Sequence, residues 1–158
     1  MLKTEKKSGL LVMSATHIGN IKDTPKRLSE LLESADLLVF EERKPSTKIL
    51  RNAQITRPYL LFNEHQQEST LVEVRSTLKA GGTVLYASDQ GCPTLDDPGS
   101  KLVALAMNVG ASLQVIPGPS ALTAALSACP FQPHPFIYAG YFYHMCSKNY
   151  QCYSRCNY

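Results

Sequence analysis

The fold is decided by the stretch Thr83-Val84-Leu85-Tyr86-Ala87-Ser88-Asp89-Gln90-Gly91-Cys92-Pro93. It begins with five largely apolar residues and turns abruptly polar at Ser88 and Asp89. An apolar run of this length that ends in turn-forming residues is typical of a buried strand entering a loop. The loop at Ser88–Pro93 carries polar residues and a glycine directly after this strand.

Four further apolar runs predict strands, at Leu10–Ala15, Leu37–Phe40, Tyr59–Phe62 and Ser112–Ile116. Apolar residues at helical spacing lie between successive runs. They predict helices that begin at Pro25 behind an Asp23 or Thr24 cap, at Ser46, near Asp97 and, after the last run, at Ser120, and a further helix that carries Leu71, Val74 and Leu78. Apolar strands that alternate with helices indicate an α/β fold, a mostly parallel five-stranded sheet flanked by helices.

The chain length of 158 residues leaves room for one domain of ordinary size. We expect a basic N-terminal extension at 1–8, the α/β domain at 9–130, and a linker, the start of a second domain and an irregular tail at 131–158. Phe136 to Ala139 could form a sixth strand. From Tyr141 onward no periodicity remains, and three cysteines and five tyrosines gather there. Such a tail is expected from a truncation or reading-frame shift in a longer gene, or from a short protein with a novel end.

Composition places the chain among globular proteins, with 44% hydrophobic and 18% charged residues. No apolar run approaches the roughly 20 residues that a membrane span needs, and the N-terminus lacks a signal-peptide core. Five cysteines are an odd number, and Cys92 and Cys129 lie far apart, which favours a reducing cytoplasm. The net charge of +3 tolerates a phosphate-bearing partner but is low for a dedicated nucleic-acid binder.

Polar or backbone-exposing residues follow each of the five predicted strands. They occupy Thr16–Asn20, Glu41–Lys44, Asn63–His65, Ser88–Pro93 and Pro117–Ser120. In open parallel sheets, ligands bind beyond the carboxyl ends of the strands, where loop amides and helix N-termini converge. Turn chemistry alone explains any one polar loop, but five together favour a small-molecule binding edge.

Several of these residues have two interpretations. Asp89 could hold a ribose, an amino group or a sulfonium charge, or it could only cap the following turn. Glu41 or Glu42 could orient or deprotonate a substrate hydroxyl while Arg43 and Lys44 attract phosphate, or the four could form a solvated helix entrance.

No metal site is predicted. His17 and His65 each stand alone and are interpreted as loop histidines. A zinc site in the tail is disfavoured because no Cys-x-x-Cys spacing links His144, Cys146, Cys152 and Cys156. A glycine-rich dinucleotide fingerprint is also missing after the first strand, which disfavours a nicotinamide-binding oxidoreductase.

Four motifs together resemble the tetrapyrrole methylase superfamily of S-adenosylmethionine-dependent methyltransferases. They are Thr16-His17-Ile18-Gly19-Asn20, Ser88–Pro93, Asp97-Pro98-Gly99 and Pro117-Gly118-Pro119-Ser120-Ala121. Over roughly residues 10–141 the chain looks most like the branch that contains the small-subunit ribosomal RNA cytidine-2′-O-methyltransferase. The resemblance implies an N-terminal α/β domain, a second α/β domain that is almost wholly missing here, and a methyl donor, S-adenosylmethionine, in the cleft between them.

The resemblance also implies roles for individual residues. Glu41, Glu42 and Glu64 are the candidate catalytic helpers that remove a proton from the acceptor. Thirteen residues would border the cofactor: Thr16, Ile18, Gly19, Asn20, Asp89, Gln90, Gly91, Cys92, Pro93, Pro117, Gly118, Ser120 and Ala121.

We therefore expect an S-adenosylmethionine-dependent methyltransferase that acts on an RNA ribose hydroxyl or another nucleophile, with ribosomal RNA as a candidate substrate and a homodimer as a candidate assembly. A cleft with one wall predicts weak cofactor binding and little turnover by this chain alone. The alternative is a non-catalytic domain that pairs with itself or another chain through the face the second domain would cover.

Overall fold

Strands and helices alternate along the chain in the computed structural model, which describes residues 8–63, 65–94 and 97–138. The elements are β1 (Leu10–Ser14), η1 (Ile21–Asp23), α1 (Lys26–Ser34), β2 (Leu37–Phe40), α2 (Arg43–Asn52), β3 (Leu60–Leu61), α3 (Gln67–Lys79), β4 (Thr83–Ala87), α4 (Ser100–Asn108), β5 (Ser112–Ile116) and α5 (Ala121–Ser127). The predicted α/β class and the five strands are confirmed.

The sheet is parallel throughout, in the order β3-β2-β4-β1-β5. Ser14 at the end of β1 pairs with Ala87 and Ile116, the last residues of β4 and β5. Phe40 at the end of β2 likewise pairs with Ala87. All these strands therefore end level, and their following loops emerge along one edge.

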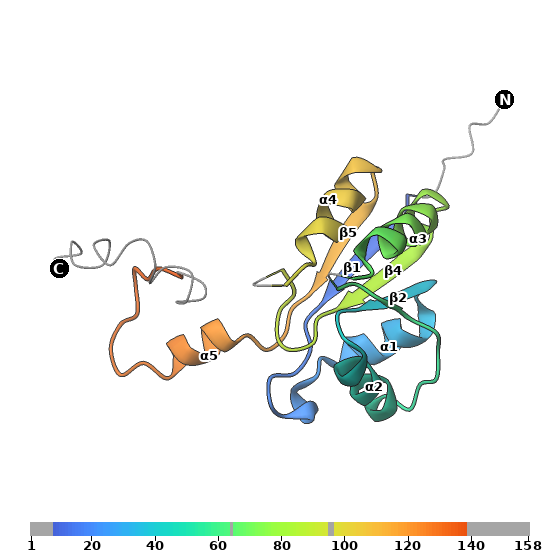
Figure 1. Ribbon diagram of the computed structural model, residues 1–158. Coiled ribbons are helices and arrows are strands. Elements are labelled where there is room, and N and C mark those ends of the chain that lie inside the picture. Colours follow the sequence, from blue (N-terminus) through green and yellow to red (C-terminus); the bar gives the residue numbers. More distant parts are fainter. Residues whose placement is uncertain (1–7, 64, 95–96, 139–158) are drawn as a thin grey trace. The chain divides into compact units, whose positions relative to one another are not determined.

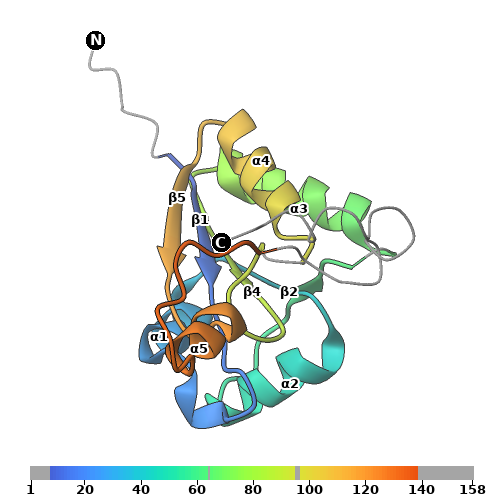
Figure 2. The same cartoon turned by 90° about the vertical axis from the view of Figure 1, so that its left-hand side faces the viewer.

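Helices cover both faces of the sheet (Figures 1 and 2). On one face α3 and α4 pack over a core that contains Tyr86, Val74 and Leu102. On the other face α1 and α2 pack over a second core, with Leu28 and Ile49 among its members. The three middle strands, β1, β2 and β4, are buried on both sides, which explains why they read as continuous apolar runs.

The crossovers that follow β1 and β4 run in opposite directions. The chain leaves β1 through α1 and crosses to β2, and it leaves β4 through α4 and crosses to β5, on the opposite face and in the opposite direction. Because β1 and β4 are neighbours, these two chain paths separate at adjacent carboxyl ends. This is the switch point at which parallel α/β sheets bind ligands.

Two helix starts differ from the sequence expectation. The second helix begins at Arg43 rather than Ser46, because Pro45 falls in its first turn, where a backbone donor is not needed. The fourth begins at Ser100 rather than near Asp97, because the Asp97 carboxylate accepts the backbone N–H of Gly99 at 2.7 Å and holds a turn.

Smaller differences concern the first helix and the third strand. Pro25 precedes α1 as its N-cap residue instead of opening the helix, and Asn20 caps the short η1 before it. Strand β3 has only two residues, Leu60 and Leu61, where four were expected. The pairing with β2 covers just these two positions, which limits the strand.

The chain divides into two units, Met1–Ser127 and Ala128–Tyr158. In the second unit the described residues 128–138 form no helix or strand, so the predicted sixth strand does not form over Phe136 to Tyr138. Ala139 and the tail beyond it, with its candidate zinc ligands, lie outside the described residues. Within the described part of the chain, no helix is long and apolar enough to cross a membrane.

Candidate functional site

The loops that follow β1 and β4 are joined by hydrogen bonds. The Thr16 backbone N–H donates to the Gly91 carbonyl at 2.9 Å, and the Gly91 N–H donates to the His17 carbonyl at 3.4 Å. The buried Ser88 hydroxyl donates to the same Gly91 carbonyl at 2.6 Å. Gly91 has a φ of +73°, a conformation that favours glycine. This glycine therefore allows the two loops to close on each other.

The loop after β5 meets the same junction. The Cys92 sulfur lies 3.5 Å from the Pro119 carbonyl oxygen. A Cβ on Gly118 would lie 2.8 Å from Ala15 Cβ and 2.8 Å from Pro25 Cγ, so only glycine fits without a shift. The ends of β1, β4 and β5 thus meet in one place, as the sequence predicted.

The thirteen candidate cofactor-binding residues differ in exposure. Thr16, Gly91 and Pro93 are buried, and Ile18, Asp89, Cys92 and Ser120 are partly buried. The exposed positions form the outer part of the loops: Gly19, Asn20, Gln90, Pro117, Gly118 and Ala121. The buried Thr16 hydroxyl has no hydrogen-bond partner in the described structure, which leaves a polar atom at the junction that a ligand could satisfy.

A second group of polar side chains joins the ends of β2, β3 and β4. The Glu42 backbone N–H donates to Asp89 Oδ1 at 3.1 Å. Asn63 Nδ2 donates to Glu42 Oε1 at 3.4 Å. These contacts bring two of the predicted site residues, Glu42 and Asp89, together from strands 47 positions apart in sequence. Glu64, the third predicted catalytic helper, lies outside the described residues.

Glu41 is a carboxyl group of this set with a pKa near neutrality. Partial burial, then the charges of Asp89 and Asp97, raise its pKa to about 7, against an opposing hydrogen bond from the Asp89 backbone. Burial also raises the pKa of Asp89, although the hydrogen bond from the Glu42 backbone opposes it. A carboxyl group with a pKa near 7 can both accept and release a proton at neutral pH.

Sequence reasoning missed two members of this group, Tyr86 and Asp97. Tyr86 is fully buried, and neither its hydroxyl nor Asp97 Oδ2 has a hydrogen-bond partner of ordinary geometry among the described residues. Burial and then the charges of Asp97, Glu41 and Asp89 raise the pKa of Tyr86. The sequence signals were a tyrosine inside an apolar strand and an aspartate at the head of the Asp97-Pro98-Gly99 motif. We name Glu41, Asp89, Asp97 and Tyr86 the carboxylate cluster.

The histidines and cysteines do not form a metal site in the described residues, where no three His, Cys, Asp or Glu side chains lie close enough to hold an ion. His17 is 5% exposed, and its Nδ1 lies 3.3 Å from the Thr24 hydroxyl. Burial, followed by the charge of Lys48, lowers its pKa. A neutral, hydrogen-bonded His17 packs the first loop, in line with its interpretation as a loop histidine.

An apolar groove of about 390 Å³ adjoins the Cys92-Pro93 turn. Met13, Val103 and Val115 contribute to its walls from β1, α4 and β5. The carboxylate cluster and the apolar groove therefore both lie beside the junction of the three loops. A ligand with a cationic group and a flat apolar ring would find complementary surfaces here.

Comparison with known proteins identifies the family. The tetrapyrrole (corrin/porphyrin) methylases match residues 16–136, which include the thirteen candidate cofactor-binding residues and the carboxylate cluster. The chain belongs to the tetrapyrrole methylase family. This membership confirms the resemblance that the four sequence motifs carry.

The curated relatives show which members of the family this chain is similar to. The ribosomal RNA small subunit methyltransferase I of Thermotoga maritima is 35% identical over 133 residues, which cover 84% of this chain and 60% of that protein. The protein of the same name from Bacillus subtilis is 32% identical over 133 residues, 84% of this chain and 46% of its own length. The chain thus spans about half the length of the curated relatives it matches.

Solved structures share the fold. Uroporphyrin-III-C-methyltransferase from Thermus thermophilus superposes with a TM-score of 0.56 at 19% identity, over 77% of this chain and 52% of that one. Diphthine synthase superposes with a TM-score of 0.55 at 16% identity, over 76% of this chain and 48% of that one. At these identities the likeness concerns the arrangement of strands and helices.

Proposed function

We propose that this chain forms the methyl-donor-binding part of a methyltransferase that uses S-adenosylmethionine and methylates RNA. The observation that carries the proposal is the junction of the β1, β4 and β5 loops at the switch point of the sheet, closed by the Thr16–Gly91 hydrogen bond of 2.9 Å. Family membership and the relatives' name support the class of reaction and the class of substrate.

The residues at the junction fit the proposed cofactor. When bound, S-adenosylmethionine supplies a methyl group that its sulfonium charge has already activated. Asp89 would hold a cationic or hydroxyl group of the cofactor, and the unpartnered Thr16 hydroxyl would bind a polar atom. The apolar groove beside Cys92 and Pro93 would receive the adenine ring.

Glu41 is the proposed proton acceptor. A ribose hydroxyl must lose its proton as it is methylated, and a carboxylate with a pKa of about 7 is suited to take it at neutral pH. The charge of Asp97 would help to keep the pKa of Glu41 high. Glu42 would position Asp89 through its backbone N–H rather than act on substrate itself.

A homodimer is proposed as the assembly. Strand β5 lies at one end of the sheet, and Leu113 and Val115 on it are 45% and 57% exposed. Both side chains also line the apolar groove beside Cys92 and Pro93, so a second copy of this chain packed against the β5 edge would complete the outer wall of that groove. We also propose a cytoplasmic location, where ribosomal RNA substrates are found.

Isothermal titration calorimetry with S-adenosylmethionine tests the cofactor part of the proposal. We expect saturable but weak binding, and at least a tenfold loss in Asp89→Ala. Gln114→Ala, a change of a partly buried polar residue on β5 away from the cluster, is the matched control and should bind normally. A chain that releases no binding heat at high cofactor concentration would refute the assignment.

A further inference from the structure

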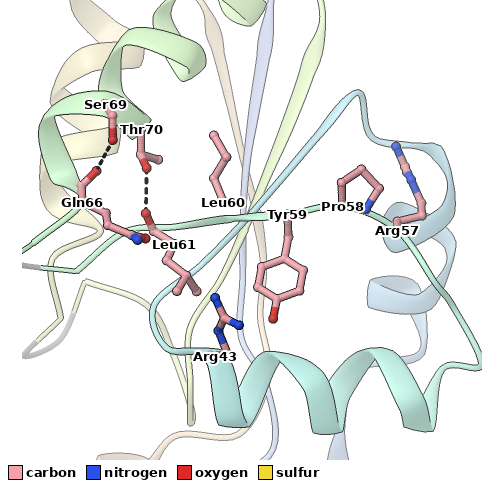
Figure 3. A pocket seen from close by; sticks show the side chains of 9 residues that line it. All are labelled: Arg43, Arg57, Pro58, Tyr59, Leu60, Leu61, Gln66, Ser69 and Thr70. Carbon is pink, nitrogen blue, oxygen red and sulfur yellow. Dashed lines mark hydrogen bonds between the residues drawn. The ribbon is translucent and has the colours of Figure 1, made fainter.

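A polar groove of about 530 Å³ lies at the other end of the sheet, beside the edge strand β3. Arg43 from the start of α2 and Tyr59 from the segment before β3 reach into the same space, and Gln66 and Ser69 approach it from the start of α3 (Figure 3). This edge groove contains none of the proposed cofactor-binding residues. Its function is therefore separate from that of the loop junction.

The two arginines of the edge groove have different environments. The Arg57 guanidinium donates to the carbonyl oxygens of Leu32, Glu33 and Ala35, at 2.7 to 3.0 Å, and so caps the end of α1. Arg43 is exposed, and no ion pair joins it to any residue that the structure describes. Arg43 is the cation of the groove that remains available to an anionic ligand.

The outer face of α2 extends this positive charge. Lys44, Lys48 and Arg51 follow each other at helical spacing of four and three residues, and all three are exposed. The helix contains no acidic residue, and its buried side chains, such as Ile49, face the core. We name Lys44, Lys48 and Arg51 the α2 stripe. The α2 stripe alone carries three positive charges, as many as the net charge of +3 of the whole chain.

The edge groove and the start of the α2 stripe lie next to Glu42, which contacts the carboxylate cluster. Glu42, the N-cap residue of α2, precedes Arg43 directly and is hydrogen-bonded to Asp89 and Asn63. The charge of Lys48 also reaches His17 in the first loop. Arg43 therefore lies at the end of α2 next to Glu42, while the methyl-donor loops lie on the side of β1 and β5.

In this arrangement the phosphate groups of an RNA strand and its ribose hydroxyls are attracted to different places. Phosphate groups are attracted to the α2 stripe and Arg43 and are repelled by the carboxylates of the cluster. A neutral ribose hydroxyl carries no such penalty and can approach Glu41. Tyr59, held edge-on against Phe40 at a ring distance of 5.4 Å, offers a fixed aromatic surface of the kind on which an unpaired base stacks.

We propose that the α2 stripe and the edge groove bind the phosphate backbone of a single-stranded segment of the RNA substrate, with Tyr59 beside one of its bases. The inference rests on the proposed function for the identity of the ligand as RNA. It adds the surface that holds the RNA and the direction from which the strand reaches the carboxylate cluster.

Fluorescence anisotropy of a labelled single-stranded RNA oligonucleotide tests this surface with the whole chain over a series of salt concentrations. Lys44→Gln/Lys48→Gln should weaken binding about tenfold at low salt. It should also reduce the slope of log affinity against log salt by about 1.4, the value for two phosphate contacts on a single strand. Arg43→Gln should weaken binding too.

The matched control is Arg75→Gln/Lys79→Gln, which removes the same charge from exposed positions toward the end of α3. Equal weakening by the two double variants would overturn the inference, since it would mean attraction to charge alone. Equal losses for an acidic peptide and for RNA would also overturn it. Matched thermal unfolding midpoints establish that each variant is folded.

Calorimetry with S-adenosylmethionine on the same variants separates this inference from the proposed function. Normal cofactor binding with an unchanged RNA affinity in Lys44→Gln/Lys48→Gln would refute the RNA surface alone. RNA binding that depends on the α2 stripe in a chain that does not bind the cofactor would refute the proposed function and leave the RNA surface standing.

Discussion

Individual residues at the strand ends carry most of the chemistry. Glu41 lies with Asp89 and Asp97 in a partly buried group of carboxyl groups, and each of the three has a raised pKa. Like charges in a site of reduced solvation favour retention of a proton. A carboxyl group with a pKa near 7 can transfer a proton at neutral pH, and ionising it there costs stability. At Glu41 the stability cost can be measured directly.

Glu41→Gln should change how stability depends on pH. The pKa of Glu41 is raised in the fold from 4.5 to about 7, so folding favours the protonated form. Its favourable contribution is full below about pH 4.5 and is lost as the pH rises through 7. The variant should therefore gain about 1 kcal/mol in unfolding free energy relative to the parent between pH 5 and 8, after a discount for solvent screening.

Urea unfolding at pH 5, 6, 7 and 8 measures this difference. Glu30→Gln, an exposed carboxylate on α1, controls for the loss of a surface charge. A difference between Glu41→Gln and the parent that stays constant across this range would mean that Glu41 does not hold its proton in the fold.

Gly118→Ala should destabilise the loop junction. The added Cβ would lie 2.8 Å from Ala15 Cβ and from Pro25 Cγ, so the loops must move apart. We expect a loss of about 1–3 kcal/mol in unfolding free energy, as for overpacked sites. Gly19→Ala, at a φ of +74° with nothing within 4 Å, isolates the backbone cost at about 1 kcal/mol. A stability of Gly118→Ala equal to that of the parent would contradict the close approach.

At the scale of elements, the strands were predicted better than the helix starts. The bounds of β2 and β4 match because a strand buried on both faces appears as one uninterrupted apolar run, whereas the bounds of β5 match although most of its residues are exposed. The starts of α2 and α4 were wrong because they depend on Pro45 in a first turn and on the Asp97 side chain, which apolar periodicity does not record.

The candidate site was also predicted in part. The loops after β1, β4 and β5 could be predicted to converge because parallel strands end at a common edge. The carboxylate cluster could not be completed from sequence, because Tyr86 and Asp97 come together only through the packing of β4 against the turn before α4. The apolar pattern along the chain also does not predict the order of the strands in the sheet. That order determines which loops flank the switch point.

Helix α4 offers a direct test of the two-layer core. Leu102 is fully buried against the sheet, whereas Met107 on the same helix is 71% exposed. Leu102→Ala should cost about 2–5 kcal/mol of unfolding free energy and Met107→Ala less than about 0.5 kcal/mol. Chemical denaturation of the two variants measures the difference. Equal costs would mean that α4 does not pack as described.

At the scale of the molecule, the proposed homodimer predicts a dependence on the exposed edge of β5. Sedimentation velocity should give a dimer for the parent chain. Leu113→Lys/Val115→Lys should shift it to a monomer without loss of fold, because both side chains are largely exposed. Val72→Lys, an equally apolar and exposed position on α3, is the control and should leave the dimer intact. A monomeric parent would remove the β5 edge as the interface.

The central claim is that the ends of β1, β4 and β5 form a methyl-donor site. Titration of the isotopically labelled chain with S-adenosylmethionine, followed by the backbone amide signals in NMR, tests it most directly. The account predicts saturable shifts centred on Thr16, Gly91 and Gly118, with the amides of α3 near Lys79 unchanged. Shifts centred elsewhere, or none at saturating cofactor, would contradict it.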